Sequence, residues 1–306
     1  MAYKPWRSAA RRGHSNTRVG SIVVTSDSHL PTVSVTLTNP SREGGVVRMR
    51  YDGRIALITG GSRGIGRQLA SDLAAAGATV VVAARSQPDI TATVASIREA
   101  GGKAWGLRCD VADLDQVHGT VAAVERDHGR LDLLATCAAI APVAPVAELD
   151  PHALQRVVGV NLLGTMWCAQ AVLPLMRRQH AGTIVTFSSH SARLPLPRAA
   201  AYCATKAGVA AFTEALYTEV HRDGIDVLTV YPAVVPDTDL ARADIAQRGA
   251  PPKWATRTAA EVSRAVLRAL ASGRTQVVLP RGSTAVHVIR ALAPTLTLRR
   301  LAKTTQ

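Results

Sequence analysis

Apolar and polar positions follow a regular rhythm between residues 52 and 280. Short runs of aliphatic and β-branched residues alternate with longer segments whose apolar residues recur at helical spacing. The short runs are continuous, which is typical of parallel strands with helices on both faces. The rhythm predicts an α/β fold: one domain, residues 51–280, with a doubly wound (Rossmann) parallel sheet of seven strands. The expected strands are residues 54–59, 79–84, 104–108, 131–136, 182–188, 226–231 and 275–279.

The expected helices between these strands are residues 65–76, 89–100, 113–128, 150–179, 200–223 and 258–271. Residues 236–255 break the rhythm with Gly249 and the pair Pro251-Pro252, and we expect a loop with a short helix there. Residues 281–306 form a tail in which Leu, Val, Ile and Ala alternate with Arg. This pattern predicts a basic amphipathic helix, which either contacts a membrane surface or packs on the domain edge or a partner subunit.

Residues 1–50 differ from the rest of the chain. Ser, Thr, Asn, Gly and Arg dominate, and the short β-branched runs belong to no larger pattern. We expect a basic, disordered extension outside the fold. Met49 stands just before the first expected strand. A true start at Met49, with residues 1–48 an over-extended reading of the gene, is therefore the alternative.

The net charge of +14 is concentrated at the two ends of the chain. Residues 1–50 carry eight basic and two acidic side chains, residues 281–306 carry five and none, and the residues between carry 23 and 20. Only five of the 36 basic residues are lysines. An arginine excess in a nearly neutral domain does not indicate a nucleic-acid surface, so we expect no nucleic-acid partner.

The composition is that of an ordinary soluble protein, with 47% hydrophobic and 19% charged residues. We expect no membrane-spanning helix, which needs about 18–20 apolar residues. The four cysteines show neither a disulfide framework nor the spacing of metal ligands. No apolar segment follows the basic N-terminal residues, so a secretory signal is not indicated. These features predict a cytoplasmic protein without a metal.

A glycine-rich turn follows the first expected strand and opens a helix. Such a turn lets the backbone approach a pyrophosphate, whose charge the N–H groups at the helix N-terminus hold. Tight strand-to-helix turns also use glycine for conformational reasons alone, but the position after the first strand favours a dinucleotide site. The turn reads Thr59-Gly60-Gly61-Ser62-Arg63-Gly64-Ile65-Gly66.

The Thr-Gly-x-x-x-Gly-x-Gly spacing resembles the short-chain dehydrogenase/reductase family, over about residues 52–280. The resemblance implies a nicotinamide dinucleotide cofactor, an alcohol/carbonyl reaction and a homo-dimer or homo-tetramer formed through the long helices. It also implies that Asp110, in Cys109-Asp110-Val111, accepts a hydrogen bond from the adenine amino group. The alternative is that Asp110 only starts the next helix.

The second strand ends at Arg85, where NAD-binding proteins have an acidic residue for the ribose 2′-hydroxyl. Arg85 and Arg63 could bind a 2′-phosphate through charge-assisted hydrogen bonds, so we expect NADP(H) to be preferred over NAD(H). Two exposed arginines in an arginine-rich protein are the alternative. The expected cofactor-binding residues are Gly60, Ser62, Arg63, Gly64, Ile65, Gly66, Arg85, Asp110, Val111, Ala138, Tyr202, Lys206 and Val235.

Tyr202 and Lys206 share one face of the expected helix 200–223. An ammonium group beside the phenol can lower its pKa from about 10 towards the working pH, which would make Tyr202 a usable general acid. Ser189 follows a strand at the sheet edge that faces the ligand crevice. Tyr-x-x-x-Lys alone is commonly a surface pattern, but together with this serine and the glycine turn it indicates a catalytic set.

In the family that this arrangement resembles, the serine orients the carbonyl, the tyrosine transfers the proton and the lysine also holds the nicotinamide ribose. The resemblance implies these roles for Ser189, Tyr202 and Lys206. It implies for Asn161 the role of holding a water linked to the lysine, whereas composition alone makes Asn161 a polar group in a helix core. The expected reaction is hydride transfer between NADP(H) and a carbonyl, with Tyr202 as general acid/base.

The sequence departs from the family pattern in two places. The family's Asn-Asn-Ala-Gly after the fourth strand is Thr136-Cys137-Ala138-Ala139, so we expect weaker hydrogen bonding there. Val235 stands where the family's backbone meets the nicotinamide carboxamide, but the usual threonine is displaced to Thr238. A catalytically idle NADP(H) sensor, or a binding protein tethered to a membrane, is therefore the alternative function.

The expected pocket walls are residues 140–148, 190–197 and 236–254, and they are largely apolar. They favour a small hydrophobic ketone, aldehyde or secondary alcohol over a sugar. His190 and Arg193 are the polar exceptions. Arg193 either meets an acidic group of the substrate or is a solvated loop arginine.

Overall fold

The computed structural model describes residues 24–25, 32–33, 51–280 and 282–303. The chain divides into two units, Met1–Val47 and Arg48–Gln306. In the first unit, strands β1 (Val24–Thr25) and β2 (Thr32–Val33) pair antiparallel. The predicted disorder of residues 1–50 and the alternative start at Met49 otherwise lie outside the described residues.

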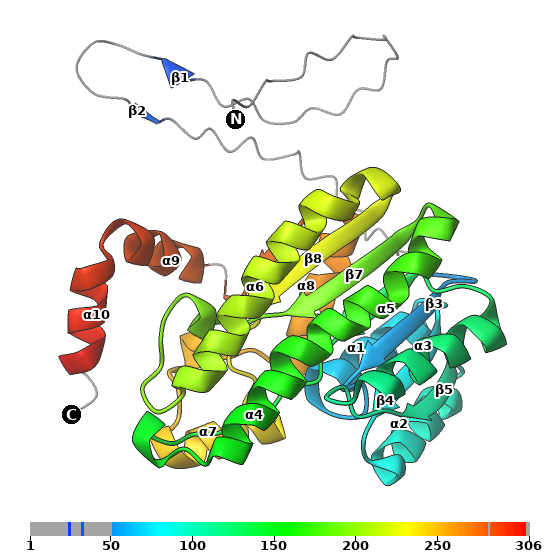
Figure 1. Ribbon diagram of the computed structural model, residues 1–306, viewed down its shortest axis with the longest axis horizontal. Coiled ribbons are helices and arrows are strands. Elements are labelled where there is room, and N and C mark those ends of the chain that lie inside the picture. The colour runs from blue at the N-terminus through cyan, green and yellow to red at the C-terminus, as the bar shows by residue number, and fades with distance from the viewer. Residues whose placement is uncertain (1–23, 26–31, 34–50, 281, 304–306) are drawn as a thin grey trace, which may run out of the picture. The chain divides into compact units, whose positions relative to one another are not determined.

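A parallel sheet organises the second unit (Figure 1), with the strand order β5-β4-β3-β6-β7-β8-β9. The seven-stranded, doubly wound sheet is thereby confirmed. Strands β3 and β6 are neighbours, and from them the chain adds strands in opposite directions: β4 and β5 beyond β3, and β7, β8 and β9 beyond β6. Ligands bind at such a switch point. The strands are β3 (Ile55–Thr59), β4 (Thr79–Ala84), β5 (Lys103–Arg108), β6 (Leu133–Thr136), β7 (Gly182–Phe187), β8 (Ile225–Tyr231) and β9 (Gln276–Val278).

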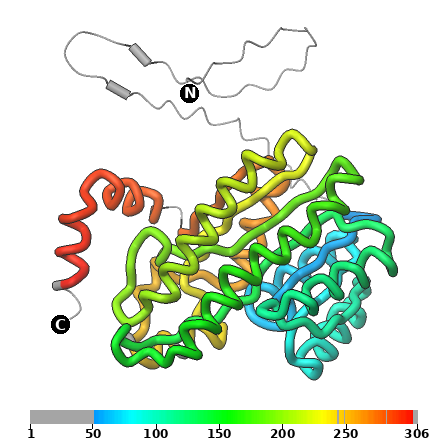
Figure 2. Tube along the Cα trace, viewed as in Figure 1, coloured from blue at the N-terminus to red at the C-terminus, as the bar shows by residue number. Residues whose placement is uncertain are grey.

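Helices cover both faces of this sheet (Figures 1 and 2). Ala56 and Ile58 of β3 belong to one apolar core with α1, α2 and α8, whereas Ile55 and Leu57 belong to a second core with α3, α5 and α6. Successive strand residues point to opposite faces, which explains why the apolar runs are continuous. The helices are α1 (Gly64–Ala75), α2 (Gln87–Glu99), α3 (Leu114–His128), α5 (Gly164–Gln179), α6 (Ala200–Val220) and α8 (Ala259–Ala271).

The long helix expected at residues 150–179 is interrupted. It consists of α4 (Pro151–Val158), a π-helical turn η2 (Gly159–Leu163) and α5. By length and composition the segment Pro151–Gln179 could cross a membrane, so the prediction that no stretch qualifies was wrong. Val172 and Met176 of α5 pack fully buried in the second core, which identifies it as a core helix of the sheet.

Shorter elements complete the described chain. The expected loop at residues 236–255 holds α7 (Asp239–Arg248) and the 3-10 turn η5 (Lys253–Ala255). The tail forms two helices, α9 (Ser283–Leu292) and α10 (Pro294–Lys303), where one was predicted. Proline cannot continue a helix but suits its first turn, so Pro294 ends one helix and begins the next. The remaining 3-10 turns are η1 (Val146–Glu148), η3 (His190–Ala192) and η4 (His221–Asp223).

Candidate active site

The glycine turn lies between the end of β3 and the start of α1. Gly60 has a φ of 64° and Gly64 a φ of 51°, in the left-handed region that favours glycine. A Cβ atom on Gly60 would lie 2.6 Å from the backbone nitrogen of Ala138, which follows β6. The turn is therefore packed against the neighbouring strand end without room for a side chain, and glycines at such a turn let a pyrophosphate approach the main chain closely.

Helix α1 begins without a side-chain cap. Arg63 at the N-cap makes no capping hydrogen bond, and the first turn holds no acidic residue. The first N–H groups of a helix have no intrahelical partner, so those of Gly64, Ile65 and Gly66 can bind an anion. Ser62 is buried, and its carbonyl oxygen accepts a hydrogen bond of 3.1 Å from Thr93 of α2. These residues fit a dinucleotide pyrophosphate.

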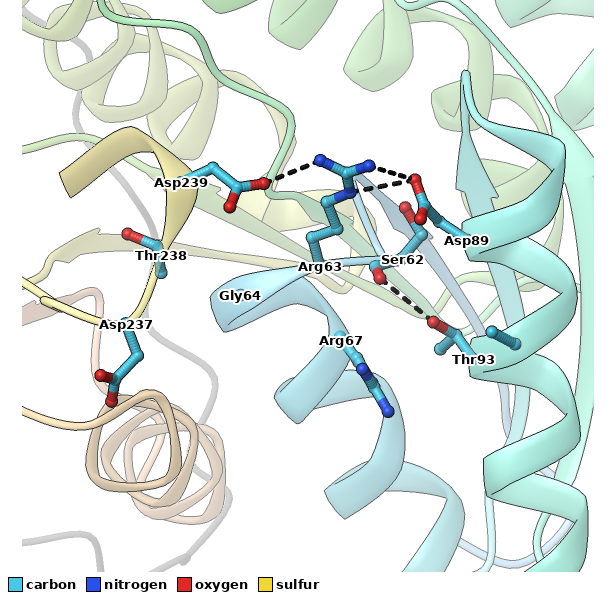
Figure 3. A pocket seen from close by; sticks show the side chains of 10 residues that line it. Ser62, Arg63, Gly64, Arg67, Asp89, Thr93, Asp237, Thr238 and Asp239 are labelled. Carbon is cyan, nitrogen blue, oxygen red and sulfur yellow. Dashed lines mark hydrogen bonds and ion pairs between the residues drawn. The ribbon is translucent and has the colours of Figure 1, made fainter. Parts of the chain in front are cut away.

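Arg63 lies between two carboxylates in a pocket of about 330 Å³ (Figure 3). Its guanidinium is 2.7 Å from Asp89 of α2 and 2.8 Å from Asp239 of α7. The pKa of Asp89 is lowered by hydrogen bonds from Ser86 and then Arg63. The sequence analysis missed both carboxylates, because only folding brings α2 and α7 to the turn. Arg63, which was expected to bind the 2′-phosphate, therefore forms ion pairs with Asp89 and Asp239 in this structure.

Arg85 directly follows β4 and is exposed. The last residue of β4, Ala84, pairs with Arg108 of β5, so Arg85 stands at the carboxyl edge of the sheet beside the expected adenosine site. The two arginines expected to act together therefore differ: Arg63 is paired with acids, whereas Arg85 stands exposed at the strand end.

Asp110 occupies a turn ahead of α3. Its Oδ1 accepts a hydrogen bond of 3.1 Å from the backbone of Ala112, and its own N–H donates to Gln116. The N-cap of α3 is Asp113, whose side chain accepts from the Gln116 N–H. The alternative that Asp110 starts this helix is therefore wrong. The neighbouring Val111 is buried.

The structure brings Tyr202, Lys206 and Ser189 together. The ammonium of Lys206 lies 5.8 Å from the centre of the Tyr202 ring, and the Ser189 side chain is near enough to oppose the rise in the pKa of the Tyr202 phenol. The hydroxyl of Ser189 accepts from the N–H of Ser191, which fixes the start of η3. Tyr202 and Lys206 are one turn apart on α6, and Ser189 follows the end of β7. These two elements thus bring a serine, a phenol and an ammonium close together.

Lys206 is buried, and its ammonium donates a hydrogen bond of 2.7 Å to the carbonyl of Phe187. The adjacent Ser188 hydroxyl donates to the carbonyl of Lys206 at 2.8 Å, so β7 and α6 hold each other in register. Burial lowers the pKa of Lys206 to about 8, and it raises the pKa of the neighbouring Cys137 thiol to about 12. Lys206 therefore stays predominantly cationic at neutral pH.

The pKa of Tyr202 is raised to about 12, whereas the sequence analysis expected Lys206 to lower it. Burial is the largest cause, and the nearby Ser189 side chain opposes it. The ammonium is directed to Phe187 rather than to the phenol oxygen, which explains why its charge does not offset the burial. In this arrangement the phenol is protonated at neutral pH.

Asn161 lies fully buried in the π-helical turn η2. Its Oδ1 accepts from the N–H of Ile140 at 2.9 Å, and its Nδ2 donates to the Ile140 carbonyl at 2.8 Å. Nδ2 is also 3.2 Å from the hydroxyl of Thr205, the residue before Lys206. Asn161 therefore joins the chain after β6 to the helix that carries the tyrosine and lysine.

The residues at the two positions that depart from the family pattern make different contacts in the structure. Thr59 and Thr136 face each other in the β3–β6 register, and neither buried hydroxyl has a hydrogen-bond partner among the described residues. Thr238 caps α7, accepting from the Ala241 N–H and donating to the carbonyl of Val235. The displaced threonine thus stabilises a helix, and it occupies a carbonyl of the residue expected to meet the cofactor.

Arg193 is held by contacts with other side chains of the protein. It donates to the Tyr231 hydroxyl at 2.9 Å and lies 3.7 Å from Glu214. Its guanidinium also lies above the ring of Tyr231, 4.3 Å from the ring centre, so Arg193 is not a freely solvated loop arginine. A contact of Arg193 with an acidic group of the substrate stays a prediction. Within the described chain, no group of three or more His, Cys, Asp or Glu is arranged to hold a metal ion.

Comparison with known proteins agrees with this geometry. The family model for short chain dehydrogenases matches residues 54–249. The short-chain reductase protein NovJ of Streptomyces niveus is 40% identical over 181 residues, which are 59% of this chain and 69% of NovJ. A D-threitol dehydrogenase of Mycolicibacterium smegmatis is 36% identical, covering 61% of this chain and 72% of the relative. A 3β-hydroxysteroid dehydrogenase of Mediterraneibacter gnavus is 35% identical, covering 67% and 75%.

Two solved structures share the fold. A metagenomic short-chain oxidoreductase in complex with NADP has a TM-score of 0.65 at 26% identity, covering 74% of this chain and 96% of that one. A Burkholderia phymatum short-chain dehydrogenase/reductase in complex with NAD has a TM-score of 0.72 at 26% identity, covering 81% and 96%. With the family model matching more than half of its residues, the chain belongs to the short-chain dehydrogenase/reductase family of oxidoreductases.

Proposed function

We propose that this oxidoreductase prefers NADP(H) and interconverts a hydrophobic secondary alcohol with its ketone, or a primary alcohol with its aldehyde. Tyr202 acts as the general acid/base. The observation that carries the proposal is that three groups meet: the buried ammonium of Lys206 lies 5.8 Å from the centre of the Tyr202 ring, and the Ser189 side chain is near enough to influence the pKa of the phenol.

The chain's own residues position and move the proton. Ser189 orients the carbonyl and donates a hydrogen bond to its developing charge, and loss of such a donor costs about 10²–10³ in rate in other enzymes. Tyr202, protonated at neutral pH, donates its proton to the alkoxide oxygen during reduction. Lys206, whose ammonium lies 5.8 Å from the centre of the Tyr202 ring, would hold the nicotinamide ribose. The bound cofactor supplies or accepts the hydride.

Arg85 supports the preference for NADP(H). It is exposed at the end of β4, where an acidic residue would repel a 2′-phosphate. Arg63 is paired with Asp89 and Asp239, but exposed ion pairs are worth only about 0–1 kcal/mol, so a phosphate can displace them. One solved relative is a complex with NADP and another with NAD, so the proposal rests on these arginines.

The pocket walls support a hydrophobic substrate. The two polar side chains expected there are engaged elsewhere: His190 bonds with His287, and Arg193 with Tyr231. Leu196 and Trp254 in the same walls are exposed. Relatives are named for both sugar alcohols and a steroid, and the apolar walls favour ligands of the second kind.

Titration of the purified protein with NADPH and NADH, followed by turnover assays, tests the proposal. We expect tighter binding of NADPH and faster turnover of apolar ketones than of sugar-derived ketones. Equal affinities would contradict the cofactor preference, and faster turnover of sugars would contradict the substrate class.

A catalytically idle NADP(H) sensor is the second candidate, favoured by the unpartnered hydroxyls of Thr59 and Thr136 beside the glycine turn. Tight NADPH binding without turnover across a broad carbonyl panel would support it. We further propose a cytoplasmic homo-dimer or homo-tetramer formed through the long helices, which light scattering after gel filtration would test.

A further inference from the structure

Helix α9 has its polar side towards the domain and its apolar side outwards. Ser283 and His287, one helical turn apart, are buried, and His287 is hydrogen-bonded to His190 at 2.9 Å. Ile289 is 58% exposed and Leu292 81% exposed on the other side. An ordinary surface helix has the reverse orientation, so a second apolar environment is needed to cover this side.

Helix α10 also exposes large apolar side chains. Leu296 and Leu298 are exposed, and Arg299 stands one turn after Leu296 on the same helix face. Residues 281–306 contain five basic residues and no acidic residue. We call α9 and α10 together the C-terminal surface. The charged residues of this surface are all basic. Its exposed large apolar side chains are Val286, Val288, Ile289, Leu292, Leu296 and Leu298.

We propose that the C-terminal surface binds the anionic face of a lipid bilayer. Its apolar side chains enter the boundary between headgroups and acyl chains, while arginines contact lipid phosphates. A second copy of the chain is the other occupant to consider. A two-fold contact between two such surfaces would place cation against cation, because the segment contains no acidic partner. The charge therefore favours the membrane.

The polar side of α9 explains how the surface stays oriented. The His190–His287 hydrogen bond of 2.9 Å and the contact of Arg193 with His287 attach the helix to the domain. The apolar side is consequently held outwards and does not fold back onto the sheet. The site described above remains on the domain, and neither proposal depends on the other.

Co-sedimentation of the full chain with vesicles tests this inference. We expect binding to vesicles of equal parts phosphatidylglycerol and phosphatidylcholine, little binding to phosphatidylcholine alone, and weakening with salt. The double variant Ile289→Gln/Leu292→Gln should bind at least about tenfold more weakly, since each buried side chain of this size contributes substantially. Arg299→Glu should weaken binding about fivefold or more.

Matched controls lie on α3, where Leu114 and Arg126 are exposed. Leu114→Gln and Arg126→Glu should bind anionic vesicles like the wild type, and all variants should keep the wild-type melting temperature. No sedimentation of the wild type with anionic vesicles would overturn the proposal. So would a dimer that the double variant converts to monomer without any vesicle binding, which would make the surface an interface between copies.

Discussion

His190 Nδ1 and His287 Nε2 lie 2.9 Å apart, so the residue after Ser189 is hydrogen-bonded to the C-terminal helix α9. His190 Nε2 contacts the carbonyl of Leu279, which only accepts, so Nε2 carries the proton and Nδ1 accepts from His287. His287 Nδ1 then accepts from Arg193 at 3.4 Å. The bonds accepted by His190 Nδ1 and by His287 Nδ1 require both imidazoles to be neutral.

This network predicts that acid destabilises the protein. Burial is the largest cause that lowers the pKa of His287 to about 4, followed by repulsion from His190 once that imidazole is protonated and by the charge of Arg193, whereas an unfolded histidine has a pKa of about 6.5. The unfolded state therefore binds the proton first as the pH falls. Stability should fall by about 3 kcal/mol between pH 6.5 and 4, and burial of His190 acts in the same direction.

Urea unfolding at pH 7 and pH 5 measures this effect. His287→Gln should be less stable than the wild type at pH 7 but should lose less stability at pH 5. His118→Gln, at an exposed position on α3, serves as the control and should follow the wild type. An unchanged slope of stability against pH in His287→Gln would contradict the neutral network.

Tyr202→Phe should reduce kcat by at least about 10²–10⁴-fold, because it removes the proton donor while keeping the ring. The affinity for NADPH should change little, since the ring and Lys206 remain. Tyr217→Phe, later on α6 where Tyr217 stacks on His221, is the matched control and should turn over normally. Single-turnover assays and fluorescence titration separate the two effects. Wild-type turnover in Tyr202→Phe would refute the assigned role.

Arg85→Ala should weaken NADPH binding by about ten- to a hundredfold, the effect of one charge-assisted hydrogen bond of 1.5–3 kcal/mol. NADH binding should be unchanged, because it lacks the 2′-phosphate. Arg156→Ala, at an exposed position on α4, controls for the loss of a surface charge. If the affinities for both cofactors fell equally, Arg85 would not discriminate between them.

The pattern of the sequence predicts the sheet because each strand is a buried aliphatic run, as in Val80, Val81 and Val82 of β4. It also predicts that Ser189, Tyr202 and Lys206 meet, since helix periodicity and strand ends determine their positions. It does not predict the pairing of Arg63 with Asp89 and Asp239. Those carboxylates come from distant helices and carry no local signal.

Two other differences have local causes. Pro294 divides the C-terminal tail into two helices, and this proline was visible in the sequence as a helix start. The raised pKa of Tyr202 could not be predicted from the sequence, because it depends on where the Lys206 ammonium points. The ammonium donates to the carbonyl of Phe187. The spacing of four residues on a helix predicts that Lys206 lies near Tyr202. Whether its charge lowers the pKa of the phenol depends on the group to which the ammonium is hydrogen-bonded, here the carbonyl of Phe187.

Thr136→Val should stabilise the protein by about 1 kcal/mol, because it removes a buried hydroxyl without a hydrogen-bond partner and nearly preserves the shape. Thr186 on the next strand is the matched control, since its buried hydroxyl is hydrogen-bonded to Thr213 at 2.8 Å. Thr186→Val should instead destabilise by about 1 kcal/mol. Urea unfolding of both variants compares them. If both variants were destabilised, the Thr136 hydroxyl would have a hydrogen-bond partner, such as an ordered water. That partner would replace the hydrogen bonds of the family's asparagine.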